Sequence, residues 1–219
     1  MRPGAHHQGD SSVAEQVPAR YPYAARIFDF DGTLVDTGDT NLRAVHAALT
    51  IHGVRAPLGW LRGVPLADLT VLRARLRDDL GASLVCSDQE IVSTARAYWL
   101  SHNDRLRPVE AVASAARAAA ASGPVAVASA NDGQIVRASL AVSGLAGLFA
   151  VVVAREDVAR LKPAPDAFLA AASWIGCEPS TCLVYENTDD GITAAGLAGM
   201  DVIDVRATPW SICRPPGPV

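Results

Sequence analysis

Short apolar runs alternate with helical patterns through most of this chain, and that alternation limits the folds it can adopt. The runs that predict β-strands are Arg26–Asp29, Val125–Ser129, Ala150–Ala154, Cys182–Tyr185 and Val202–Val205. Helical patterns occupy Val109–Ser122, Gly133–Ser143, Pro165–Ile175 and Gly191–Ala198. Strands that alternate with helices are typical of a parallel sheet with helices on both faces. We therefore predict an α/β fold with a doubly wound, five-stranded parallel sheet, whose ligand site lies at the carboxyl ends of the strands.

One long interval, residues 37–107, breaks this alternation. It contains helical patterns at Asn41–His52, Leu66–Leu80 and Asp88–His102 but no convincing strand. The interval is either a packing subdomain or a helical cap that covers the active site and excludes water; its exit point beside two aspartates favours the cap. The predicted division is a core at 23–36 and 108–208, a cap at 37–107, a disordered tail at 1–22 and an irregular extension at 209–219.

Two aspartates follow the first predicted strand. Side chains alternate along a strand, so Asp29 and Asp31 project from the same face. Two adjacent carboxylates at a strand end are costly unless a positive group lies between them. A divalent cation and a phosphoryl group would supply that neutralisation.

The later predicted strands end in polar groups suited to the same task. Ser129 and the amides near it can hold phosphoryl oxygens, and Lys162, the only lysine of the chain, precedes a proline on a stiff loop. Glu186 and Asn187 follow the fourth strand and offer hard oxygen ligands for Mg²⁺. Each signal alone is weak, but all are expected at one edge of the sheet.

The combination resembles the haloacid dehalogenase superfamily of phosphotransferases, in the branch of β-phosphoglucomutase-like enzymes and sugar-phosphate phosphatases with a helical cap. The matching segments are Asp29–Thr37, Ala128–Ala130, Lys162–Phe168 and Glu186–Met200. This order and spacing are specific, although any one segment would not be.

The resemblance implies roles for particular residues. Asp29 would be the nucleophile that forms an aspartyl-phosphate, and Asp31 the general acid and base. The phosphoryl oxygens would be bound by Thr33, Ser129, Ala130 and Lys162. The expected cofactor is Mg²⁺, held by Asp29, Asp31, Glu186 and Asn187. The implied function is hydrolysis of a small phosphorylated metabolite, with sugar phosphates favoured.

Two departures from the family pattern bear on this interpretation. Many relatives carry an aspartate where Asn187 stands, so the metal site here has one negative charge fewer. The mutase carries an arginine where Leu66 falls and a histidine where Asn41 falls, so a bisphosphate-handling mutase is less favoured. Asn41 and Arg62 are the cap residues expected to contact substrate. The alternatives are a sugar phosphomutase and a non-catalytic relative that binds a metabolite.

Composition excludes other classes of function. The net charge is −4 and no basic stripe is visible, which argues against nucleic acid as a partner. No apolar run is long enough to span a membrane. The four cysteines match no zinc spacing and are interpreted as reduced thiols, so we expect a cytoplasmic protein. We also expect a monomer or weak dimer.

Overall fold

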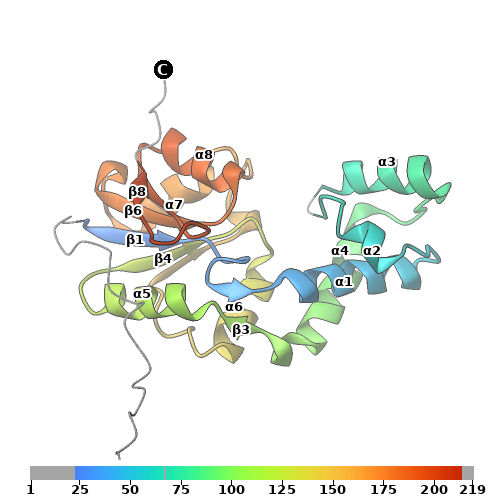
Figure 1. Cartoon of the computed structure of the whole chain (residues 1–219), viewed down its shortest axis with the longest axis horizontal. Helices are drawn as coiled ribbons and strands as arrows, with labels where there is room; N and C mark the ends of the chain where they lie inside the picture. The colour runs from blue at the N-terminus through green and yellow to red at the C-terminus, as the bar shows by residue number, and fades with distance from the viewer. Residues whose placement is uncertain (1–22, 67, 214–219) are drawn as a thin grey trace, which may run out of the picture.

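A parallel sheet forms the centre of the computed structural model, which describes residues 23–66 and 68–213. The sheet has the order β5-β4-β1-β6-β7-β8, and neighbours from β5 to β7 pair in parallel (Figure 1). These strands are β1 Ala25–Phe28, β4 Val125–Ala128, β5 Val151–Val153, β6 Cys182–Glu186 and β7 Asp201–Asp204. The predicted α/β class with a parallel sheet is confirmed, with β1 at its middle.

Four helices cover the two faces of this sheet. They are α5 Glu110–Ala120, α6 Gly133–Val142, α7 Asp166–Ile175 and α8 Asp189–Leu197. Helices α5 and α6 pack on one face, and α7 and α8 on the other (Figure 1). Successive residues of β1 serve both layers: Phe28 packs with α5 and α6, whereas Ile27 packs with α7 and α8. Short 3₁₀ turns lie at Asn103–Arg105, Arg155–Asp157 and Pro179–Thr181.

A helical subdomain leaves the core immediately after β1. It comprises α1 Gly38–Ile51, α2 Leu58–Leu61, α3 Leu69–Leu80 and α4 Asp88–Ser101, and it projects to one side of the sheet (Figure 1). Its helices have their own buried cluster, centred on Leu49, Leu61 and Leu72. The two connections to the core are the short strands β2 Val35–Asp36 and β3 Arg107–Pro108, which pair antiparallel. We call this subdomain the cap.

The end of the described chain differs from the expected irregular extension. Strand β8, Ile212–Cys213, pairs antiparallel with β7 and adds a sixth strand at the sheet edge. Trp210 and Ile212 are partly buried and pack against the core cluster that contains Phe28, and this apolar contact holds the segment against the sheet. The predicted tail at 1–22 and residues 214–219 lie outside the described residues. Among the described helices, none has the length and apolar character needed to cross a bilayer.

Candidate active site

Asp29 lies at the carboxyl end of the central strand β1. Its amide donates to the carbonyl of Tyr185 at 2.9 Å, so the sheet pairing with β6 continues up to this residue. Because Phe28 is in register with Val127 of β4 and Tyr185 of β6, the carboxyl ends of these strands and the residues just after them meet at the same edge. Register therefore brings Asp29, Ser129 and Glu186 together, as the alternation of elements predicts.

Lys162 links the two buried carboxylates of this edge. Its Nζ donates to Asp29 Oδ1 at 2.7 Å, to Glu186 Oε2 at 2.8 Å and to the Ala128 carbonyl at 3.0 Å. The lysine side chain is only 7% exposed, and its ammonium lies over the ring of Phe168. With three acceptors around it, the ammonium is fixed as a point charge beside Asp29.

The protonation states of this pair follow from burial and mutual attraction. Burial raises the pKa of Asp29 to about 7, although the Lys162 charge acts in the opposite direction. Burial alone would lower the pKa of Lys162, but the Asp29 and Glu186 carboxylates outweigh it and the pKa is raised. The lysine is therefore a cation at neutral pH, and its charge favours the ionised, nucleophilic form of Asp29.

Asp31 is held from two sides. Thr37 Oγ1, at the start of the cap, donates to Asp31 Oδ1 at 2.8 Å, and Asn131 Nδ2 donates to both carboxylate oxygens at 3.2 Å. Burial raises the pKa of Asp31, and these hydrogen bonds oppose the shift. The role of Asn131 in orienting Asp31 was not predicted, since an asparagine after a strand is an ordinary turn residue.

Glu186 accepts hydrogen bonds from the main chain and from Lys162 at this edge, and its expected role as a metal ligand stays a prediction. Its Oε1 accepts the amides of Asn187 and Thr188 at 2.8 and 2.9 Å, and Oε2 accepts Lys162. Both oxygens are therefore occupied by internal donors. A Cβ on Gly191 would collide with this carboxylate, so glycine is required there for Glu186 to fit.

Two buried oxygens of the site have no hydrogen-bond partner within the described chain. They are Thr33 Oγ1 and Asn187 Oδ1. A buried polar atom without a partner is costly unless a ligand or ion completes it. The Thr33 hydroxyl is chemically suited to a phosphoryl oxygen and the Asn187 amide oxygen to a cation, and both roles stay predictions.

The loop after β4 presents the other expected phosphoryl-binding residues. Ala130 lines the cavity described below. Ser129 is fully buried, and its Oγ accepts the Asn131 amide at 3.0 Å. Its own amide donates to Val153 in the sheet. In this arrangement Ser129 shapes the loop that carries Ala130 and Asn131.

A cavity of about 900 Å³ lies between this edge of the sheet and the cap. Asp29, Asp31 and Lys162 line it on the core side. On the cap side it is lined mainly by apolar residues, including Leu66, together with Asn41. Asn41 therefore lies at the cavity, and its contact with substrate stays a prediction.

Arg62, the second cap residue expected to contact substrate, is not brought to this cavity. Its side chain is 66% exposed and faces Asp39 at 3.9 Å. The turn that follows α2 directs it outward, so this position does not support a substrate role.

Helix α4 of the cap is anchored to helix α6 of the core. Arg96 Nη2 lies 2.5 Å from Asp132 Oδ2 in an ion pair, and Trp99 Nε1 donates to Ser139 Oγ at 3.1 Å. Arg96 and Asp132 also line the large cavity. Neither was singled out from the sequence, because only the three-dimensional placement of the cap brings them together.

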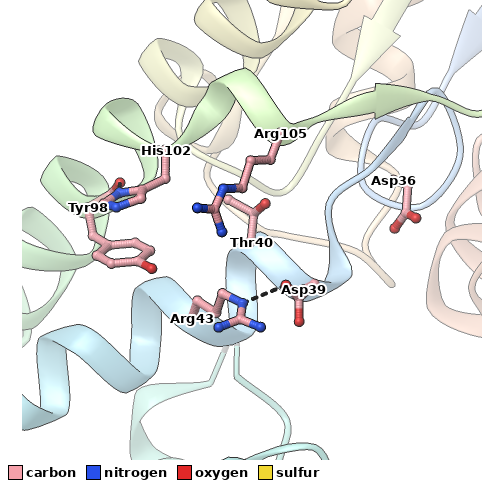
Figure 2. Close-up of a pocket in the computed structure, with 7 residues that line it drawn as sticks. All are labelled: Asp36, Asp39, Thr40, Arg43, Tyr98, His102 and Arg105. Atoms are coloured by element: carbon pink, nitrogen blue, oxygen red, sulfur yellow. Dashed lines mark hydrogen bonds and ion pairs between the residues drawn. The ribbon is translucent and has the colours of Figure 1, made fainter.

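A second, smaller pocket of about 120 Å³ lies where α1, α4 and the following turn meet (Figure 2). It is lined by Asp36, Asp39, Thr40, Arg43, Tyr98, His102 and Arg105 and shares no residue with the large cavity. Arg43 is already paired with Asp39 at 2.6 Å, and Tyr98 stacks on His102. Its charges are balanced internally, and none of the expected catalytic residues reaches it.

The fold and this constellation agree with the family to which the chain is matched. The family model described as haloacid dehalogenase-like hydrolase matches residues 26–205, and the chain belongs to this family. A fructose-1-phosphate phosphatase, YqaB of Escherichia coli, is 35% identical over 84% of this chain and 97% of its own length. The protein CbbY of Rhodobacter capsulatus is 30% identical over 86% of this chain and 92% of its own length. The enzyme class expected from the sequence, a phosphatase of this family, is confirmed by such relatives.

Solved structures show the same architecture. The crystal structure of a predicted phosphoglycolate phosphatase from Haemophilus somnus matches with a TM-score of 0.70 at 20% identity. The match covers 83% of this chain and 84% of that one. CbbY of Rhodobacter sphaeroides, in a complex with xylulose 1,5-bisphosphate, has a TM-score of 0.72 at 21% identity and covers 82% and 84%. At these identities the likeness concerns the fold.

Proposed function

We propose that this chain is a Mg²⁺-dependent phosphatase that hydrolyses a small sugar phosphate through an aspartyl-phosphate on Asp29. The observation that carries the proposal is the direct contact of Asp29 with Lys162 in the cavity that Asp31 also lines, beneath a helical cap. The relative named as a fructose-1-phosphate phosphatase supports the substrate class.

The chemistry consists of two displacements at phosphorus. A carboxylate oxygen of Asp29 attacks the phosphorus of the monoester, the bond to the leaving oxygen breaks, and the Asp31 carboxyl protonates that oxygen. Asp31 then takes a proton from a water molecule while the oxygen of that water attacks the phosphorus of the aspartyl-phosphate. The bond between phosphorus and the Asp29 oxygen breaks, which releases inorganic phosphate and regenerates the Asp29 carboxylate.

Fixed groups of the chain support both steps. Lys162 offsets the negative charge of the phosphoryl oxygens, and Thr33 offers a hydroxyl that has no other hydrogen-bond partner within the described chain. Asn131 and Thr37 hold the Asp31 carboxylate in place for proton transfer. The apolar residues on the cap side of the cavity would disfavour bulk water beside a bound substrate.

The residues present fit a Mg²⁺ ion. The Asp29 carboxylate, the main-chain carbonyl of Asp31 and the buried, unpartnered Oδ1 of Asn187 would hold it. When bound, the ion supplies charge neutralisation and orientation of the phosphoryl group. Glu186 would support the ion indirectly, because its carboxylate accepts hydrogen bonds from the Asn187 main-chain amide and from Lys162 and so fixes both residues.

Hydrolysis is favoured over mutase chemistry by the cap side of the cavity. A mutase must hold a second phosphate at the cap, but Leu66 and Asn41, which line the cavity there, carry no charge, and the charge of Arg96 is paired with Asp132. Neither residue can therefore neutralise a distal phosphate of a bisphosphate intermediate.

The proposal is tested by phosphate release from p-nitrophenyl phosphate and a panel of sugar phosphates, with Mg²⁺ or with EDTA. Asp29→Asn and EDTA should each abolish turnover. Asp78→Asn, an exposed aspartate on α3, is the matched control and should behave as wild type. Near-wild-type activity of Asp29→Asn would contradict the nucleophile assignment. With glucose 1-phosphate and a trace of glucose 1,6-bisphosphate, glucose 6-phosphate forming faster than phosphate would identify a mutase instead.

A further inference from the structure

Arg96 stands out on the cap side of the large cavity. Among the described cap residues that line it, Arg96 is the only charged one; the others are apolar apart from Asn41. It lies on α4, whereas the phosphoryl-binding groups lie at the sheet edge. On its cap side the cavity therefore has one cationic group, Arg96, positioned to contact the part of a substrate that is not the transferred phosphate, while Arg155 lines the cavity from the core.

Asp132 fixes the position of this arginine and neutralises it. Asp132 Oδ1 accepts the amides of Gln134 and Ile135 at 3.0 and 3.3 Å, which caps α6 and immobilises the carboxylate. Its Oδ2 pairs with Nη2 of Arg96. The pair occupies one guanidinium nitrogen, Nε is buried without a partner in the described chain, and 36% of the Arg96 side chain stays exposed. Most of its donors are thus not used by the protein.

The charges around the cavity indicate which chemical group of a substrate the Arg96–Asp132 pair can bind. Carboxylates outnumber cations five to three among the ionisable residues that line it. A second phosphate at the cap would meet an arginine whose charge Asp132 already cancels, within a net negative surrounding. A hydroxyl group meets both a donor, the guanidinium, and an acceptor, the carboxylate, without any unpaired charge.

We propose that Arg96 and Asp132 are the specificity-determining pair of this enzyme: they bind the neutral, hydroxylated part of a monophosphate and disfavour bisphosphates. This inference rests on the proposed function and names the substrate class of the same site. The competing explanation is that the ion pair only fastens α4 to α6, as the Trp99–Ser139 contact does. A purely structural contact would affect all ligands alike, whereas a specificity pair affects only hydroxylated ones.

Binding to the Asp29→Asn protein, measured by calorimetry with Mg²⁺, separates these explanations without turnover. The ligands are fructose 1-phosphate, fructose 1,6-bisphosphate and phenyl phosphate, which lacks hydroxyls. We expect the monophosphate to bind at least about tenfold more tightly than the bisphosphate. Arg96→Gln should weaken fructose 1-phosphate roughly 10-fold to 100-fold, the range for losing a hydrogen bond to a charged group, and leave phenyl phosphate within about twofold.

Two further variants sharpen the test. Asp132→Asn leaves the Arg96 charge uncancelled, so the preference for the monophosphate over the bisphosphate should narrow. Arg105→Gln is the matched control, because Arg105 lines the smaller pocket and makes no hydrogen bond or ion pair with any residue that the structure describes (Figure 2). Its affinities should not change.

Several outcomes would overturn the inference: equal weakening of fructose 1-phosphate and phenyl phosphate by Arg96→Gln, fructose 1-phosphate binding no tighter than phenyl phosphate, or equal affinity for the bisphosphate. These are distinct from failure of the proposed function. A wild-type protein that releases no phosphate from any ester fails as a phosphatase, yet its ligand preferences still test the pair.

Discussion

Removing the Lys162 charge is the perturbation whose cost the structure defines best. Lys162→Met keeps a long apolar stem beside Phe168 but leaves the Asp29 and Glu186 carboxylates, 10% and 0% exposed, without their shared cation. Breaking a buried ion pair by removing one partner costs about 3–5 kcal/mol. We expect about 3 kcal/mol, the lower end of that range, because a carboxylate in this pair can take up a proton and reduce the penalty. The rate of phosphate release should also fall at least about 10²-fold, since a preorganised charge at the phosphoryl group is lost.

The assay is urea unfolding followed by tryptophan fluorescence and circular dichroism, together with steady-state kinetics. Arg160→Met provides the control, because this residue lies on the same loop and its ion pair with Asp166 involves a side chain that is 70% exposed. A pair so exposed contributes about 0–1 kcal/mol. If Lys162→Met and Arg160→Met lose the same stability, or if Lys162→Met keeps full activity, the account of the buried charge network is refuted.

Three further substitutions test other parts of the site. Asp31→Asn should slow hydrolysis roughly 10²–10⁴-fold, and more for alkyl than for nitrophenyl leaving groups; equal losses across a leaving-group series would show that it does not protonate the leaving oxygen. Asn187→Asp should lower the Mg²⁺ concentration for half-maximal activity, and an unchanged titration would place this residue away from the ion. Gly191→Ala should lower the free energy of unfolding by about 1–3 kcal/mol through collision with Glu186. Gly59→Ala is the control and should leave the free energy of unfolding unchanged, because a Cβ there meets no atom within 4 Å. Equal melting temperatures for Gly191→Ala and Gly59→Ala would contradict the predicted collision with Glu186.

The sheet and its chemical edge could be predicted from the sequence because each depends on local patterns. Alternating apolar runs and helical segments give the parallel sheet, and the strand ends place Asp29 and Glu186 side by side. The interaction of Glu186 with Lys162 illustrates the limit: both residues were expected at the site, but their distance depends on how the loop after β5 folds over the sheet. The sequence indicated a metal ligand at Glu186, and the structure adds hydrogen bonds to Lys162 and to the amides of Asn187 and Thr188 that no sequence pattern shows.

Contacts between the cap and the core could not be predicted in the same way. Helical periodicity shows which face of α4 is apolar, but it does not show which core helix that face meets. Arg96 and Asp132 are 36 residues apart, and their pairing arises only once α4 lies against α6. Arg62 shows the opposite outcome: the sequence predicted that its loop faces the active site, but its side chain is exposed and faces Asp39. Strand β8 was missed because a two-residue edge strand carries no periodic signal.

The central claim is that Asp29 carries the phosphoryl group between the two displacements. The direct test is to quench the enzyme with acid during steady-state turnover, reduce any acyl phosphate with borohydride, and locate the product by mass spectrometry of the peptides. The account predicts homoserine at position 29 in the wild-type protein and none in Asp29→Asn. Reduction product at another carboxylate, or active turnover with no modified peptide, would contradict it.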